Sequence, residues 1–244
     1  MPRFFKEYFA SEPVITGSDA AHIAKSLRMK PGERLVVCDT RGYDYICRIE
    51  TVSPEAVALQ IEEKRKTASE PTVFTTLFVC LPKGDKMDGI IKQVVELGVC
   101  EIVPVLSARC VARPDLRTAA KKCERWQKIA NEAAGQSGRG ILPAVRPMCS
   151  LKECAAALHT YDQALLFYEL GGAPVGTLAF HIGERIALIT GCEGGFDAAE
   201  AEWLQNSGAK ALTLGPRILR AETAPAAALS CVMLLSGNLG PAAE

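Results

Sequence analysis

Two passages near the end of the chain, LITGCEGGF (188–196) and LTLGPRILRAETA (212–224), decide the fold class. Each is a short apolar run that passes into an irregular loop punctuated by glycine, as expected where a buried strand ends. In the first loop, Gly191, Gly194 and Gly195 allow a tight turn that exposes backbone N–H and C=O groups to a ligand. Because ligands bind beyond the carboxyl ends of strands in open parallel sheets, these two loops and the segment after Phe167 predict one binding site.

The chain around these passages alternates apolar strands with helices from residue 72 onward. This pattern indicates an α/β fold with a mostly parallel sheet covered on both faces. Strands are predicted at 73–82, 100–107, 163–170, 185–190 and 209–215. Helices are predicted within 83–99, 118–138, 197–208 and 225–237.

The first 68 residues are β-rich instead. Strands are predicted at Leu35–Cys38, Tyr43–Glu50 and Ala56–Glu62, separated by the turn sequences DTRG and SPE. One short helix is predicted before them, with Ser18 or Asp19 as its N-cap. The charged, then small and polar stretch 62–72 is predicted to be a linker between this small barrel-like unit and the rest.

Composition narrows the function classes. The chain has 28 Lys and Arg and 28 Asp and Glu, so its zero net charge argues against an extensively basic nucleic-acid-binding protein. Its ten cysteines include no C-x-x-C pair and its three histidines are scattered, so no metal site is expected. Without a secretion signal or a long apolar run, we expect a cytoplasmic protein with reduced cysteines and no membrane span.

The glycine-rich loop does not match the phosphate-binding motifs. Neither G-x-G-x-x-G nor G-x-x-x-x-G-K-[ST] follows a strand, and Glu193 among the loop amides disfavours an anionic ligand. A cationic or neutral ligand suits the loop better. The alternative is a plain turn in which Glu193 lies near the N-terminus of the next helix, where a carboxylate is favourable.

The second loop combines a Gly-Pro turn with Arg217, Arg220 and Glu222. Thr223 is predicted to cap the following helix, with Pro225 in its first turn. A helix start alone would explain these two residues. Two long irregular loops at one sheet edge, however, favour a functional site.

Several passages, taken in order, resemble the knotted SPOUT methyltransferases and, more narrowly, the bacterial RsmE family. They are MPRFF, HIAKSLRMKPGERLVVCDTRG, KGDKMDGIIKQVVELGV, RWQKIANEAAGQSGRGILPAV, GCEGGF and LTLGPRILRAETAPAAAL. That family methylates N3 of a uridine in 16S ribosomal RNA. It usually has proline where this chain has Cys192, and we expect the turn to survive the change.

The resemblance implies two domains: a PUA-like β-barrel that binds RNA (1–68) and a SPOUT domain with a trefoil knot (72–244). It also implies S-adenosylmethionine bound in the knot. The positions that match the family's cofactor pocket are Leu166, Thr190, Gly191, Gly195, Leu214, Gly215, Ile218 and Leu219.

Methyl transfer to uridine N3 also requires loss of the N3 proton and stabilisation of charge on the uracil oxygens. We expect Arg139, Glu193, Arg220 and Glu222 to line the catalytic site, with the proton acceptor left open. Arginine stays protonated, so Arg139 is expected to stabilise charge or hold a phosphate.

The expected partners are 16S rRNA in the 30S subunit and a second copy of the chain. The candidate RNA contacts are Arg3, Lys25, Arg28, Lys30, Arg34, Lys83 and Lys86. The last helix is apolar on nearly every side, which favours a homodimer, although burial between sheet and knot is an alternative. Two other functions stay open: ribose 2′-O-methylation, and a non-catalytic RNA-binding or ribosome assembly factor.

Overall fold

A computed structural model describes residues 1–240, which divide into two compact units. The first unit comprises Met1–Glu70 and Ala134–Leu142, and the second comprises Pro71–Ala133 and the chain from Pro143 on. The break after Glu70 falls inside the predicted linker. The segment 134–142 departs from the predicted division, because Arg139 bonds to Glu70 and accepts a hydrogen bond from Arg3 through its carbonyl oxygen.

The first unit contains a five-stranded sheet in the order β1-β3-β4-β5-β2. Its strands are β1 (Arg3–Phe5), β2 (Val14–Thr16), β3 (Arg34–Cys38), β4 (Tyr43–Val52) and β5 (Ala56–Lys66). The three strands predicted from alternating apolar residues correspond to β3, β4 and β5. The two three-residue strands β1 and β2 were not predicted.

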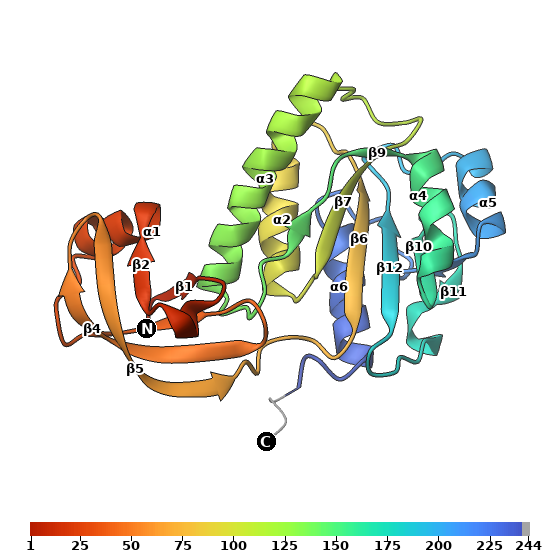
Figure 1. The fold of residues 1–244 in the computed structure, drawn as a ribbon. Coiled ribbons are helices and arrows are strands. Elements are labelled where there is room, and N and C mark those ends of the chain that lie inside the picture. The colour runs from red at the N-terminus through yellow and green to blue at the C-terminus, as the bar shows by residue number, and fades with distance from the viewer. Residues whose placement is uncertain (241–244) are drawn as a thin grey trace. The chain divides into compact units, whose positions relative to one another are not determined.

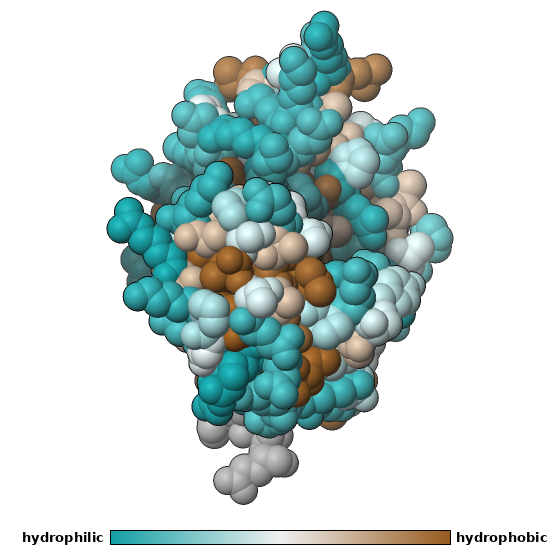
Figure 2. Space-filling model, turned by 60° about the vertical axis from the view of Figure 1, so that its left-hand side comes forward, coloured by the Kyte–Doolittle hydropathy of each residue, from teal (hydrophilic) through white to brown (hydrophobic). Residues whose placement is uncertain are grey.

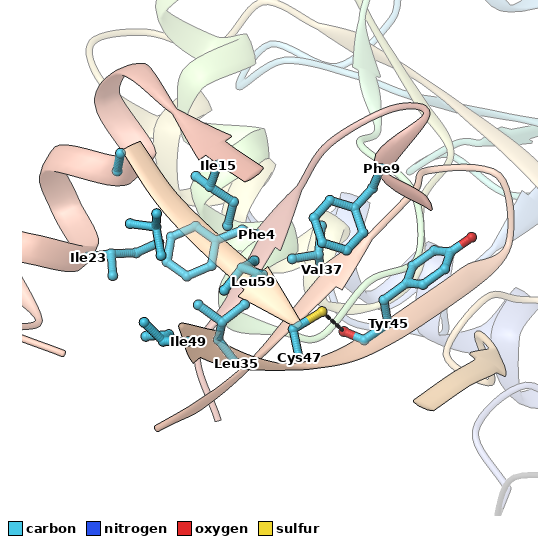
Figure 3. Packing of buried hydrophobic residues seen from close by; sticks show 12 residues of the cluster. Phe4, Phe9, Ile15, Ile23, Leu35, Val37, Tyr45, Cys47, Ile49 and Leu59 are labelled. Atoms are coloured by element: carbon cyan, nitrogen blue, oxygen red, sulfur yellow. Dashed lines mark hydrogen bonds between the residues drawn. The ribbon is translucent and has the colours of Figure 1, made fainter. Parts of the chain in front are cut away.

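Apolar side chains from these strands and from the preceding helix form the core of the first unit (Figure 3). Phe9 and Tyr45 meet edge to face at 5.4 Å between ring centroids, and the Cys47 thiol donates to the carbonyl of Tyr45 at 3.5 Å. The helix α1 (Gly17–Ala21) continues as a π-helical turn at His22–Ser26, which buries Ile23. The predicted caps are wrong: Ser18 and Asp19 lie inside α1, and Thr16 occupies the N-cap position without a side-chain bond.

The second unit contains an eight-stranded sheet in which every pair is parallel (Figure 1). Its main path runs β11-β13-β10-β12-β6-β7-β8, with β9 beside β7. The strands are β6 (Phe74–Cys80), β7 (Glu101–Leu106), β8 (Ala144–Val145), β9 (Cys149–Ser150), β10 (Gln163–Phe167), β11 (Ala173–Pro174), β12 (Arg185–Thr190) and β13 (Ala209–Thr213).

Helices connect these strands and cover the sheet (Figure 1). They are α2 (Lys86–Glu96), α3 (Leu116–Gln136), α4 (Leu151–Ala157), α5 (Ala198–Asn206) and α6 (Ala224–Leu235). In α2, Ile90, Ile91, Val94 and Val95 are buried, as their helical spacing predicts. Thr223 occupies the predicted N-cap position of α6 and Pro225 lies in the first turn, but the Thr223 side chain makes no capping hydrogen bond.

The strand order brings three chain segments to one edge of the sheet. β10 lies between β12 and β13, and its last residue, Phe167, is level with Thr190 of β12 and Leu212 of β13. Because the strands are parallel, the loops that follow them leave the same edge. Residues 168–172, 191–197 and 214–223 therefore emerge side by side, as the sequence predicted for the segments after Phe167, Ile189 and Leu214.

The surface mixes hydrophilic and apolar side chains. Figure 2 shows one face, where a few apolar groups lie between more numerous hydrophilic ones. Single exposed apolar residues are normal in soluble domains. In residues 1–240 no helix has the length and apolar character needed to cross a bilayer.

Candidate functional site

The loops at the carboxyl edge of the second sheet enclose a pocket of about 450 Å³. Its walls come from the segments after β10, β12 and β13 and from the start of α2 and α6. This is the size range of small-molecule sites, which concentrate at such edges. The pocket therefore lies where the two opening sequence passages predicted it.

Glu193 lies at the centre of the loop after β12. Its carboxylate accepts hydrogen bonds from the backbone N–H of Lys83, at 3.1 and 3.2 Å, and from the ammonium of Lys86 at 2.9 Å. Lys83 lies in the turn before α2 and Lys86 is the first residue of α2. The carboxylate of Glu193 is thus bonded to the segment that opens α2, whereas the N-terminus of α5 is capped by Asp197 and Glu200.

Glu222 reaches the same ammonium from the loop before α6. Its Oε2 atom, which is shielded from solvent, forms an ion pair with Lys86 Nζ at 3.1 Å. The side chains of Lys86, Glu193 and Glu222 retain 35%, 25% and 34% of their exposure, so the cluster opens to the pocket. We call these three residues the lysine–glutamate cluster.

Lys86 changes the acidity of both carboxylates. Partial burial raises the pKa of Glu193, but the hydrogen bonds from Lys86, from its own backbone and from Lys83 outweigh burial and lower that pKa overall. The pKa of Glu222 is lowered by its own backbone N–H and then by Lys86. Both carboxylates are therefore ionised at neutral pH and accept protons poorly.

The glycines of the site give the pocket a backbone wall. Gly195 has a φ of +63° and Gly215 a φ of +104°, values that favour glycine strongly. The N–H of Gly195 donates to the carbonyl of Cys192 at 2.9 Å, so the turn survives with cysteine in place of proline. Arg109 holds this turn from outside by donating to the carbonyl of Gly194 at 2.7 Å.

Six of the eight predicted cofactor positions line this pocket: Gly191, Gly195, Leu214, Gly215, Ile218 and Leu219. The other two, Leu166 and Thr190, are fully buried at the ends of β10 and β12, where they support the loops. Thr190 is notable because its buried hydroxyl has no hydrogen-bond partner within the described chain. Of the predicted catalytic residues, Glu193, Arg220 and Glu222 also line the pocket.

Arg139 is not among the residues that line this pocket. It belongs to the first unit, where its side chain is 3% exposed and donates to Glu70 from Nε at 3.0 Å and from Nη2 at 2.8 Å. The sequence analysis expected Arg139 to line the catalytic site, where it would stabilise charge or hold a phosphate. Its burial against a carboxylate instead gives it a structural role in the first unit.

Arg3 is likewise a correction to the predicted RNA contacts. Its side chain is 9% exposed, and its guanidinium donates two hydrogen bonds to the carboxylate of Asp44, at 3.0 and 2.5 Å. The predicted RNA contact Lys86 also forms ion pairs within the protein, with Glu193 and Glu222. Among the remaining candidates, Arg34 pairs with Glu62 at 2.7 Å, and the exposed positions are Lys25, Arg28, Lys30, Arg34 and Lys83.

Sequence reasoning missed several residues of the pocket, among them Tyr168, Glu169 and Thr213. The segment after Phe167 was recognised as a site loop, yet its polar residues were not assigned. Glu169 could have been assigned to the site, because it is an acidic residue in the sequence YEL that directly follows the apolar run ending at Phe167. In the described part of the chain, no three His, Cys, Asp or Glu side chains are grouped to hold a metal ion.

Comparisons with known proteins agree with this architecture. Residues 69–233 match the family model described as RNA methyltransferase domain, and residues 15–62 match RNA methyltransferase PUA domain. The chain is 34% identical over 245 residues to ribosomal RNA small subunit methyltransferase E of Bacillus subtilis, covering 95% of this chain and 96% of that protein.

Two solved structures are also similar. One is a ribosomal RNA small subunit methyltransferase E from Neisseria gonorrhoeae bound to S-adenosyl methionine, with 31% identity, a TM-score of 0.87 and coverage of 96% and 98% of the two chains. The other is a putative methyltransferase from Legionella pneumophila in complex with the same cofactor, with 27% identity, a TM-score of 0.85 and coverage of 96% and 97%. The chain therefore belongs to the RNA methyltransferase family, within the group named ribosomal RNA small subunit methyltransferase E.

Proposed function

We propose that this protein uses S-adenosylmethionine to methylate N3 of a uridine in 16S rRNA of the small ribosomal subunit. The observation that carries the proposal is the pocket at the carboxyl edge of the sheet, built by the same loops that mark the family. Family membership and the two cofactor-bound neighbours support the choice of cofactor.

The residues of the pocket fit that cofactor. Its glycine turns expose backbone amides and carbonyls, which suit the hydrogen-bonding edge of an adenine. The leucines Leu214 and Leu219 supply apolar surface, and Glu193 and Glu222 supply negative charge for a cationic ligand. The cofactor carries a methyl group on a positively charged sulfur, which a nucleophilic nitrogen can accept.

The protein's own groups then have distinct tasks. We assign the positive charge of Arg220 to the uracil oxygens, where negative charge develops as N3 loses its proton. Glu193 and Glu222 are poor proton acceptors in their ion pairs, so we assign them to cofactor binding rather than to the base. The loops together restrict water near the reacting atoms.

We also propose the trefoil knot and the homodimer that the family resemblance implies. For the dimer, the support is apolar surface: Ile218 is 82% exposed and Leu234 of α6 is 65% exposed. A second copy that covers these side chains would remove that surface from water. The small N-terminal unit, with its exposed Lys25, Arg28 and Lys30, is proposed to hold the RNA.

Labelled methyl transfer tests the function directly. Undermethylated 30S subunits and naked 16S rRNA are each incubated with the protein and S-adenosylmethionine carrying a labelled methyl group, and the product is mapped by mass spectrometry. A methyl on N3 of a uracil ring is expected. A methyl on a ribose hydroxyl would instead identify a 2′-O-methyltransferase, and absence of cofactor binding by calorimetry would identify a non-catalytic binding protein.

Cofactor affinity should fall only in acid, where Glu193 and Glu222 take up protons. Since both glutamates have pKa values lowered from the usual 4.5, they are ionised above that pH and take up protons only below it. Their contribution to binding is therefore present above pH 4.5 and lost as the pH falls through the lowered pKa values. Calorimetry between about pH 7 and about pH 5 should give a constant affinity, because the amino group of the cofactor is mostly protonated there as well, and a marked loss in that range would contradict the assignment.

A further inference from the structure

Lys86 joins loops that lie far apart in the sequence. Its ammonium contacts Glu193 at 2.9 Å, across 107 residues of chain, and Glu222 at 3.1 Å. The first carboxylate lies in the loop after β12 and the second in the loop before α6, and both line the pocket. The ammonium is anchored at the first residue of α2, which packs by a buried apolar face.

Other charged groups surround the cluster without replacing this contact. Glu169 approaches from the segment after β10, since a Cβ added to Gly195 would lie 1.7 Å from its Oε1 atom. Arg109 holds the carbonyl of Gly194, while Arg217 and Arg220 line the pocket wall after β13. Within residues 1–240, Lys86 supplies the only ammonium or guanidinium group within 4.0 Å of the carboxylates of Glu193 and Glu222.

The charge of the cluster follows from this arrangement. Two ionised carboxylates and one ammonium leave one net negative charge at the pocket wall. Without the ammonium, the two carboxylates would repel each other, and one of them would bind a proton at a higher pH. The lysine therefore holds the two loops together and also keeps both acids charged.

We propose that Lys86 is a positioning residue of the cofactor site. It sets the spacing of Glu193 and Glu222 and preserves their joint negative charge, and the carboxylate pair binds a cationic group of the cofactor. This inference rests on the proposed S-adenosylmethionine site and gives Lys86 a role distinct from the predicted phosphate contact. Lysine acts here through the two acids and not on the reacting atoms.

Substitution of Lys86 by methionine tests the proposal, because methionine keeps the length of the side chain and removes its charge. Binding of S-adenosylmethionine is measured by calorimetry from about pH 7 to about pH 5.5, where the amino group of the cofactor is mostly protonated. The wild-type affinity is expected to stay constant. The affinity of Lys86→Met is expected to be lower and to fall by up to about tenfold per pH unit once the raised pKa of one glutamate is passed.

Two further variants distinguish this role from an effect of the substitution on the fold. Lys86→Arg retains the charge and is expected to restore a pH-independent affinity. Lys92→Met makes the same change on an exposed residue of α2 and is expected to bind as the wild type does. Thermal unfolding of each variant shows whether the fold is kept.

S-Adenosylhomocysteine distinguishes the cationic group involved, because it keeps the amino group and lacks the positive sulfur. A pH effect of Lys86→Met confined to S-adenosylmethionine assigns the acids to the sulfonium, and an effect shared by both ligands assigns them to the amino group. A wild-type affinity in Lys86→Met, or a loss by the same factor at every pH, overturns the proposal. Failure of the wild-type protein to bind either ligand would instead reject the proposed cofactor.

Discussion

Replacement of Gly195 by valine is expected to abolish cofactor binding and methyl transfer. Valine is strongly disfavoured at a φ of +63°, because its branched Cβ crowds the backbone in the left-handed region. The added Cβ would also lie 1.7 Å from Oε1 and 2.5 Å from Cδ of Glu169. Both conflicts push the turn or Glu169 into the pocket, so we expect the affinity for S-adenosylmethionine to fall by about a hundredfold or more, roughly 3 kcal/mol.

Gly176→Ala is the matched control for this experiment. Gly176 does not have a positive φ, and a Cβ added there meets no atom within 4 Å. This variant should bind the cofactor with wild-type affinity. Retention of tight binding by Gly195→Val would show that the turn after β12 does not form the cofactor wall.

Replacement of Arg139 by methionine is expected to destabilise the first unit by about 3 kcal/mol. The change removes a buried guanidinium and leaves Glu70, whose side chain is 22% exposed, without its ionic partner. Urea unfolding followed by circular dichroism measures the loss. Cofactor affinity should persist, because all the residues that line the pocket belong to the second unit.

A double-mutant cycle isolates this contribution. Glu70→Gln alone removes the negative charge, and the pair Arg139→Met with Glu70→Gln should be less destabilised than the sum of the single variants. An unchanged unfolding midpoint in Arg139→Met, together with a large fall in turnover, would return Arg139 to the catalytic site. That result would contradict the structural role assigned here.

Sequence patterns predicted the elements with strong local signals. The runs at 74–80 and 185–190 are mostly apolar and show no alternation of polar and apolar residues, so their burial in the middle of a parallel sheet followed from their composition. Two-residue strands such as β8 and β11 carry no such pattern. Helix α4 was missed although Ser150 and Glu153 form the capping box that marks its start.

The site was predictable to the extent that its residues lie in continuous loops. One short passage contains Gly191, Glu193 and Gly195, and its glycines predict a loop. Lys86 contacts Glu193 only because α2 begins beside β12. A contact between residues that are 107 positions apart cannot be predicted from a local sequence pattern. The ion pair between Arg139 and Glu70 was not predictable for the same reason, since a local motif does not show which carboxylate a buried arginine contacts.

The position of β13 in the sequence determines when the pocket can form during synthesis of the chain. Since β13 pairs with β10 and the loop behind it supplies one wall of the pocket, that wall is synthesised after the strands that β13 joins. A nascent chain that stops before residue 209 can already form β6, β7, β10 and β12, yet it lacks one wall of the pocket. The pocket therefore forms only after β13 has been translated and has folded onto the other four strands.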